Sequence, residues 1–235
     1  MSDGRETGPD GRLSRAAAQR LSQYLRCLGG AARAGGTVSS DDLAQAVGVS
    51  AAQVRRDLAA LGHLGQRGVG YDAAGLASAI RRTLGIDRVW RSVLVGVGNL
   101  ARALLRYRAF RDQGFEIVAL FDADPAKVGQ EVEGLTVEPV ATIRPRVREL
   151  RAELAVLTLP SEPAQAVADA VVEAGVKGLL NFAPVILRTP PGVKVVTVDL
   201  AIQLEQLAFL VQMRSLGTPT AELPEEGVEP GGGDG

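Results

Sequence analysis

Apolar positions at helical spacing fill the first part of the chain and predict a small helical domain. Between Leu13 and Leu28 they recur every three or four residues, which is the spacing of one helix face. Gly29-Gly30 is expected to end this first helix. The polar run 39–42 offers a capping hydroxyl and first-turn carboxylates, so a short second helix is predicted to follow and to end near Gly48.

A third helix is predicted almost at once, with Ser50 as its N-cap and an apolar stripe of Val54, Leu58 and Leu61. Two short helices separated by a glycine turn form a helix-turn-helix. The run 65–71 is too rich in glycine for a helix and is expected to be a basic β-turn or wing. Asp72 then caps a further helix, whose apolar positions are Leu76, Ile80 and Leu84.

The hydrophobic period changes after Trp90, where Ser92–Val97 is a continuous apolar run of the kind found in strands buried on both faces. Further strands are expected at 115–121, 155–159, 178–181 and 193–198, with helices through Leu104 and Tyr107 and at 163–174. This alternation predicts an α/β domain, a Rossmann-like, doubly wound parallel sheet.

The last predicted helix, Leu200–Leu216, is apolar over more than one face and needs a partner to cover it. The expected organisation is a disordered tail at 1–12, a winged helix-turn-helix domain at 13–88, a Rossmann domain at 89–198, the C-terminal helix at 199–216, and a disordered acidic tail at 217–235. The two tails are rich in glycine and polar residues and hold too little apolar surface to fold.

The composition of the chain excludes several classes of protein. The chain of 235 residues is 46% hydrophobic and 4% aromatic, which indicates aliphatic cores. One cysteine and one histidine exclude a disulfide framework and the common zinc sites, so no metal is expected. No apolar run approaches the roughly 18 residues of a membrane span, and the N-terminus is polar and rich in glycine, unlike a signal peptide, so a cytoplasmic protein without a membrane partner is expected. The net charge of −1 hides a basic segment, because 13–90 holds ten arginines against five aspartates, a net charge of +5.

The motif Gly96-Val97-Gly98-Asn99-Leu100-Ala101 lies where a strand is expected to turn into a helix, and it matches the dinucleotide fingerprint with alanine in the third position. The alternative is a tight turn without a ligand. Asp122 ends the next strand, at the spacing of the acidic residue that binds an adenosine ribose, so NAD is favoured over NADP. Lys127 lies close enough in sequence to weaken that preference.

Hydride-transfer enzymes usually place an acid or base beside the nicotinamide, and the candidates here are few. His63 falls in the N-terminal domain, and Lys127, Lys177 and Lys194 have no catalytic motif around them. A sensor is therefore favoured over an enzyme.

The predicted recognition helix carries the candidate DNA contacts. Ser50 starts it, Arg55 and Arg56 follow on its first turns, and both can reach bases or phosphates. Gln53 has two competing roles, capping the helix or reading adenine. In the wing, Arg67 beside Gly68 is placed to enter a minor groove. The alternative is a solvated basic surface.

Five ordered segments together resemble the Rex family of redox-sensing transcriptional repressors, over about Leu13–Leu216. They are Gln53-Val54-Arg55-Arg56-Asp57-Leu58, Arg67-Gly68-Val69-Gly70-Tyr71, Gly96-Val97-Gly98-Asn99-Leu100, Phe121-Asp122-Ala123-Asp124-Pro125-Ala126-Lys127-Val128-Gly129 and Asn181-Phe182-Ala183-Pro184. The resemblance implies a homodimer that binds an inverted-repeat operator when NADH is low and releases it when NADH rises. Ala101 departs from the glycine often found there, which the fingerprint tolerates.

The resemblance also implies residue roles. Phe182 is expected near the nicotinamide, and the helix from Asp199 is expected to cross to the partner subunit. Arg26, Tyr107 and Asp199 are expected to rearrange between ligand states, with Tyr107 also at the cofactor site. Plainer roles remain for each, since Phe182 can be core, Tyr107 half-buried on its helix and Asp199 an N-cap. Two rival functions stay open, an NAD-dependent oxidoreductase and a transcription factor sensing another ligand such as coenzyme A.

Overall fold

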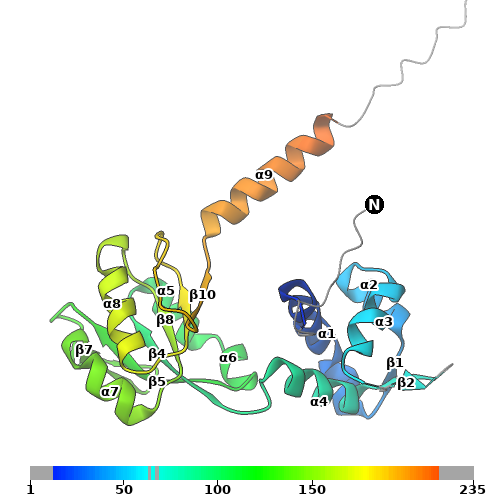
Figure 1. Ribbon diagram of the computed structural model, residues 1–235, viewed down its shortest axis with the longest axis horizontal. Coiled ribbons are helices and arrows are strands. Elements are labelled where there is room, and N and C mark those ends of the chain that lie inside the picture. The colour runs from blue at the N-terminus through cyan, green and yellow to red at the C-terminus, as the bar shows by residue number, and fades with distance from the viewer. Residues whose placement is uncertain (1–12, 63–64, 67–68, 217–235) are drawn as a thin grey trace, which may run out of the picture.

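The computed structural model describes residues 13–62, 65–66 and 69–216. They form a small helical domain and a larger α/β domain, joined by a short segment between α4 and β4 (Figure 1). The two predicted tails lie outside the described residues, as does His63.

The helical domain is built on α1 and the helix-turn-helix pair. Its helices are α1 (Arg15–Ala34), α2 (Ser40–Val47), α3 (Ala51–Ala59) and α4 (Ala73–Leu84). Leu21, Tyr24 and Leu28 of α1 are buried together with apolar residues of the other three helices, so one core holds the domain. The helix-turn-helix and the helix capped by Asp72 are therefore confirmed as elements.

The expected end of the first helix is wrong. Helix α1 runs through Gly29-Gly30 and ends at Ala34, and its C-cap Gly35 has a φ of 67°, the left-handed conformation that glycine adopts readily. The helix continues because Leu28 on one side of the glycines and Ala31 on the other both pack into the core. Tertiary packing here outweighs the helix propensity of glycine, which is about 1 kcal/mol poorer than that of alanine.

A small antiparallel sheet of β1 (Thr37–Val38), β2 (Gly65–Gln66) and β3 (Gly70–Asp72) supports the predicted wing. Strand β3 lies in the middle, paired with both of the others. The candidate residues Arg67 and Gly68 lie outside the described residues.

The α/β domain contains a sheet of seven strands within the described part of the chain, in the order β10-β9-β8-β4-β5-β7-β6. Its elements are β4 (Trp90–Val95), α5 (Asn99–Arg106), α6 (Ala109–Asp112), β5 (Phe115–Asp122), β6 (Glu131–Val132), β7 (Leu135–Pro139), the 3-10 helix η1 (Val140–Thr142), α7 (Ile143–Leu150), β8 (Leu154–Leu157), α8 (Ser161–Glu173), β9 (Gly178–Asn181) and β10 (Lys194–Thr197). Among the strands described for this sheet, only β6 is antiparallel. Numbered along the chain, the six parallel strands lie in the order 3-2-1-4-5-6, which is the Rossmann arrangement.

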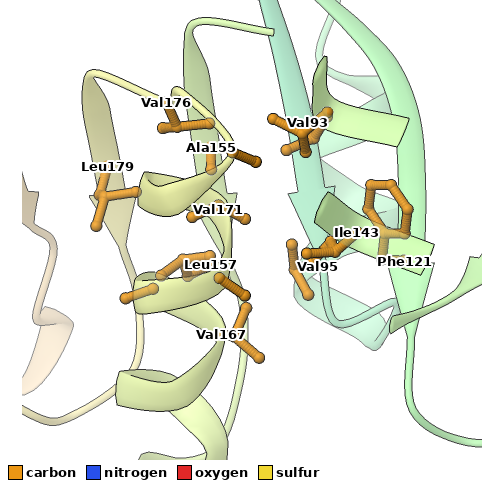
Figure 2. Packing of buried hydrophobic residues seen from close by; sticks show 14 of the residues in the cluster. Val93, Val95, Phe121, Ile143, Ala155, Leu157, Val167, Val171, Val176 and Leu179 are labelled. Carbon is orange, nitrogen blue, oxygen red and sulfur yellow. The ribbon is translucent and has the colours of Figure 1, made fainter. Parts of the chain in front are cut away.

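Side chains that alternate along the strands fill two cores, one on each face of the sheet. On one face Val93 and Val95 of β4 pack with residues of α7 and α8, among them Ile143 and Val171 (Figure 2). On the other face Leu94 packs with Ala101 of α5 and with Leu120 and Val156. The central strands are thus covered on both sides, as the unbroken apolar run at the start of the domain predicted.

The segment joining the two domains is tied down by side chains. The indole N–H of Trp90 donates at 2.6 Å to the carbonyl of Gly85, which is the C-cap of α4. The Arg88 guanidinium lies 3.7 Å from the centre of the Trp90 ring and makes a bidentate ion pair with Glu153, at 2.6 and 3.0 Å. This joint connects the end of α4 to the sheet.

Helix α9 (Leu200–Leu216) has the predicted bounds and projects from the end of β10 away from both domains (Figure 1). Its large apolar side chains from Leu200 to Met213 are between 47% and 66% exposed. Among the described residues, none of the helices is long and apolar enough to cross a membrane. Nor does that part of the chain hold a cluster of three or more potential metal ligands from histidine, cysteine, aspartate and glutamate.

Candidate functional site

Local hydrogen bonds cap the starts of both helices of the helix-turn-helix, α2 and α3. In α2 the Ser39 hydroxyl accepts from the Asp42 backbone and the Asp42 carboxylate accepts from the Ser39 backbone, a complete capping box. The Ser50 hydroxyl accepts from the Gln53 backbone N–H at 3.2 Å and starts α3 as predicted. Gly48 caps the end of α2 in the left-handed conformation, with a φ of 76°, and Ser50 caps the start of α3, so local hydrogen bonds fix the turn between the helices at both ends.

Both candidate base-reading arginines lie exposed on α3. Arg55 donates to the hydroxyl of Ser40 at 3.2 Å, and Arg56 donates to the side-chain oxygen of Gln53. Neither is paired with a carboxylate of the described residues, so both present a positive charge at the surface of α3.

Behind this surface lies a buried network that the motif analysis missed. Asp57 of α3 is only 3% exposed, and Arg20 of α1 donates to both of its carboxylate oxygens, each at 2.7 Å. The hydroxyl of Tyr24 donates to the same carboxylate at 2.8 Å, and the amide of Gln53 donates at 3.0 Å. One feature of the sequence could have revealed this network. Asp57 is a charged residue on the predicted apolar stripe of α3, three residues after Val54.

Charge and hydrogen bonding set the ionisation of this network. Burial on its own raises the pKa of the Asp57 carboxyl, but hydrogen bonds from Arg20, Tyr24 and Gln53 outweigh it and hold that pKa below its usual range. Burial and the neighbouring carboxylate raise the pKa of Tyr24, so the hydroxyl keeps its proton and donates. Asp57 is therefore a carboxylate, which can only accept hydrogen bonds.

The glycine motif forms the turn from β4 to α5, at the point where the strand order reverses. Gly96 has a φ of 94°, and a Cβ there would lie 2.5 Å from the carbonyl oxygen of Thr158. A Cβ on Gly98 would meet nothing within 4 Å, and no side chain caps the helix that begins there. Buried Ala101 packs at the base of the turn. The turn therefore leaves backbone N–H groups and open space where a pyrophosphate binds in this fold.

The residues of the glycine turn and of the first turn of α5 divide between core and surface. Val97 is buried, whereas Asn99 is exposed and Leu100 is 40% exposed. The Val97 backbone N–H donates at 2.7 Å to Asp122, at the end of β5. That carboxylate also accepts from the Asp124 backbone at 2.9 Å and from the Lys127 ammonium at 3.1 Å.

Asp122 thus fixes the glycine turn as well as occupying the position predicted for a ribose contact. Burial raises the pKa of the Asp122 carboxyl, while the hydrogen bonds from Asp124, Val97 and Lys127 lower it further than burial raises it. The group is ionised, and Lys127 partly neutralises it. The sequence indicated the carboxylate but not its bond to the turn, which depends on the pairing of β4 with β5.

Phe182 follows β9 and packs against the core cluster that includes Val97 and Ala101, so it lies at the same carboxyl end of the sheet as the glycine turn. Tyr107 instead follows the far end of α5, 56% exposed, with its ring 5.5 Å from that of Phe110. An eight-residue helix is about 12 Å long, so within one chain the structure does not bring Tyr107 to the turn.

The three residues expected to rearrange are also separate. Arg26 lies exposed on α1, and the Asp199 carboxylate caps α9 by accepting from Ala201 and Ile202 at 2.9 and 3.3 Å. No hydrogen bond or ion pair joins Arg26, Tyr107 and Asp199 in the described chain. Their expected rearrangement stays a prediction, and it requires a partner subunit or another ligand state.

A helix-turn-helix domain with a basic recognition helix, followed by a Rossmann domain with an open glycine turn, defines a ligand-responsive DNA-binding regulator. Residues 12–59 match the family model described as a putative DNA-binding protein N-terminus, and residues 87–185 match the one described as a CoA binding domain. The chain belongs to the Rex family of redox-sensing transcriptional repressors.

Relatives and solved structures carry this assignment. The redox-sensing transcriptional repressor Rex of Rhodopirellula baltica is 49% identical over 203 residues, 86% of each chain. Rex of Desulfitobacterium hafniense is 46% identical over 83% of this chain and 93% of its own. The structure of RSP with β-NAD+ and operator DNA has a TM-score of 0.81 at 31% identity, covering 87% of this chain and 94% of that one. RSP with β-NADH has a TM-score of 0.77 at 29% identity, covering 87% and 96%.

Proposed function

We propose that this protein is a repressor that binds an inverted-repeat operator while NADH is scarce and leaves it when NADH occupies the glycine turn. The observation that carries this proposal is that one chain joins exposed Arg55 and Arg56 on a recognition helix to an open dinucleotide turn. The similar RSP structures, one with β-NAD+ and operator DNA and one with β-NADH, support the same pair of ligands.

The residues of the turn fit a dinucleotide. Gly98 leaves room for the pyrophosphate, and the uncapped start of α5 offers N–H groups and a favourable dipole. Asp122 is already ionised and can accept a hydrogen bond from a ribose hydroxyl. When bound, the nicotinamide supplies the redox signal, and Phe182 is the aromatic side chain that we place beside it.

The Asp122 carboxylate favours NADH over related ligands that carry a further phosphate. NADPH and coenzyme A both carry a phosphate on the adenosine ribose, and Asp122 repels it. Lys127, 3.1 Å from that carboxylate, lowers the repulsion, so we expect a preference rather than exclusion. Competition binding among NADH, NAD+, NADPH and coenzyme A measures it, and tightest binding of coenzyme A would support the rival ligand instead.

Helix α9 supports the homodimer. Its exposed apolar side chains, among them Leu204, Leu207 and Leu210, need covering, and a second copy of the chain supplies an identical surface for a symmetric exchange. Two recognition helices then face half-sites about one helical turn of DNA apart, or a multiple of it. A regulator of DNA with a single, unpaired cysteine fits a cytoplasmic location.

Operator binding measured across NADH/NAD+ ratios tests the switch. NADH has to bind the released state more tightly, and a change from 99:1 to 1:99 requires a differential affinity of about 10⁴. Linkage then requires operator DNA to weaken NADH binding by the same factor. Equal NADH affinity with and without the operator contradicts the switch. Turnover of NADH with carbonyl substrates in a protein that does not bind the operator would support the oxidoreductase.

A further inference from the structure

The hydrogen bonds of Gln53 fix which way its side-chain amide faces. The residue lies between the buried Asp57 network and the exposed surface of α3. Its side-chain nitrogen donates to Asp57 over 3.0 Å, while its side-chain oxygen accepts from Arg56. Asp57 is an ionised carboxylate and accepts only, so the amide must turn its NH₂ group inward. The oxygen is then left facing outward, where it can accept only from a donor such as the Arg56 guanidinium.

Asp57 is itself held from the other helix. Arg20 grips both oxygens of the carboxylate in a bidentate pair, and the Tyr24 hydroxyl adds a third bond, so the acceptor cannot rotate without losing bonds to α1. The contacts therefore run without a break from α1 through Asp57 and Gln53 to Arg56. Arg55 lies outside this series, because it donates instead to the hydroxyl of Ser40 in α2.

We propose that Gln53 is a positioning residue, which aims the Arg56 guanidinium at the DNA through the α1-anchored carboxylate of Asp57, rather than a reader of adenine. A bidentate contact to adenine uses one amide N–H and the amide oxygen together. Here those two groups already face opposite partners, one buried and one on the helix surface. This inference rests on the proposed function, since it assumes that α3 binds DNA.

A double-mutant cycle on the full-length protein tests the role. Gln53→Met removes the amide but keeps the length and helix propensity of the side chain. We expect it to weaken operator binding about three- to thirtyfold in the wild-type background and less than about twofold in an Arg56→Ala background, since the residues act as a unit. In an Arg55→Ala background the full loss should persist. The same loss in the wild-type and Arg56→Ala backgrounds would overturn the proposal, because an independent base contact gives additive losses.

A measurement without DNA separates this inference from the proposed function. Nitrogen-15 relaxation of the arginine Nε–H groups reports side-chain order on the fast timescale. Gln53→Met should lower the order parameter of Arg56 and leave that of Arg55 unchanged, and Gln53→Ala should do the same. An unchanged Arg56 in both variants refutes the positioning role. A wild-type protein that fails to bind any operator refutes the proposed function alone, and the relaxation result still decides the role of Gln53.

Discussion

Replacing Arg20 by methionine should unfold the DNA-binding domain locally while the rest of the protein stays intact. The substitution keeps most of the aliphatic stem and removes the guanidinium that pairs with Asp57. The side chains of the pair are 16% and 1% exposed, so solvent screens them little. Removing one partner of such a pair typically costs about 3–5 kcal/mol, because the other charge stays buried. That is a large share of the roughly 5–15 kcal/mol that stabilises a domain.

Hydrogen exchange followed peptide by peptide suits this prediction, since it reports the opening of each domain separately. Amides of α1 and α3 should lose protection in Arg20→Met, while those of β4 and β8 keep it. The matched control is Arg144→Met, which removes a surface pair with Glu173 whose members are 51% and 58% exposed, and which should change protection by no more than about 1 kcal/mol. The double variant Arg20→Met with Asp57→Asn should recover much of the loss, because no buried charge remains.

The pH dependence has a definite sign. In the wild type the pKa of Asp57 is lower in the folded state, so its contribution to stability is present above the ordinary value near 4 and is lost as the pH falls through the folded pKa. Without Arg20, burial should raise this pKa, and the domain should then gain stability as the pH falls from neutral. A change of less than about 1 kcal/mol in Arg20→Met, or an unaltered pH dependence, would refute the reasoning, since the pair would then behave like a surface one.

Three further predictions concern the ligand site and the dimer. Asp122→Ala should weaken NADH binding by about 1.5–3 kcal/mol and improve NADPH relative to NADH, as competition titration would show, and a wild type that binds both equally would contradict the assignment. Gly98→Val should weaken NADH binding with little change in thermal stability, whereas Gly96→Ala should lower the melting temperature, because only the second substitution meets backbone within the fold; the opposite pattern would argue against a ligand at the turn. A chain ending at Asp199 should lose α9, become monomeric in sedimentation and lose tight operator binding, and a truncated dimer that still releases DNA with NADH would remove α9 from the switch.

Local chemistry explains which elements could be predicted. The caps Ser39, Ser50 and Asp72 each act within three residues of the helix they start, so the sequence shows them directly. The sequence predicts no helix or strand between Asp122 and β8. Strands β6 and β7 there are short and near the sheet edge, with polar residues that give no clear period, and α7 carries Pro145 in its first turn.

The sites show a similar division. The glycine turn could be predicted, since its motif lies within six consecutive residues between a strand and a helix. The Asp57 network could not, because Arg20 and Tyr24 lie 37 and 33 residues away and meet the carboxylate only when α1 packs on α3. For Asp122 the sequence predicts only the contact with a ribose. Its bond to Val97 could not be predicted, because that bond depends on which strands pair. Motif reasoning thus finds groups that are close in sequence and misses those that packing brings together.

The joint between the two domains also equips the protein with its own optical probe. Trp90 is the only tryptophan, so tryptophan emission from this chain comes entirely from that position. Its indole is bonded to the carbonyl at the end of α4 and stacked under Arg88, and both contacts would alter if α4 turned relative to the sheet. A change in the intensity or wavelength of this fluorescence on adding NADH or operator would therefore follow the motion between domains in real time, without any label.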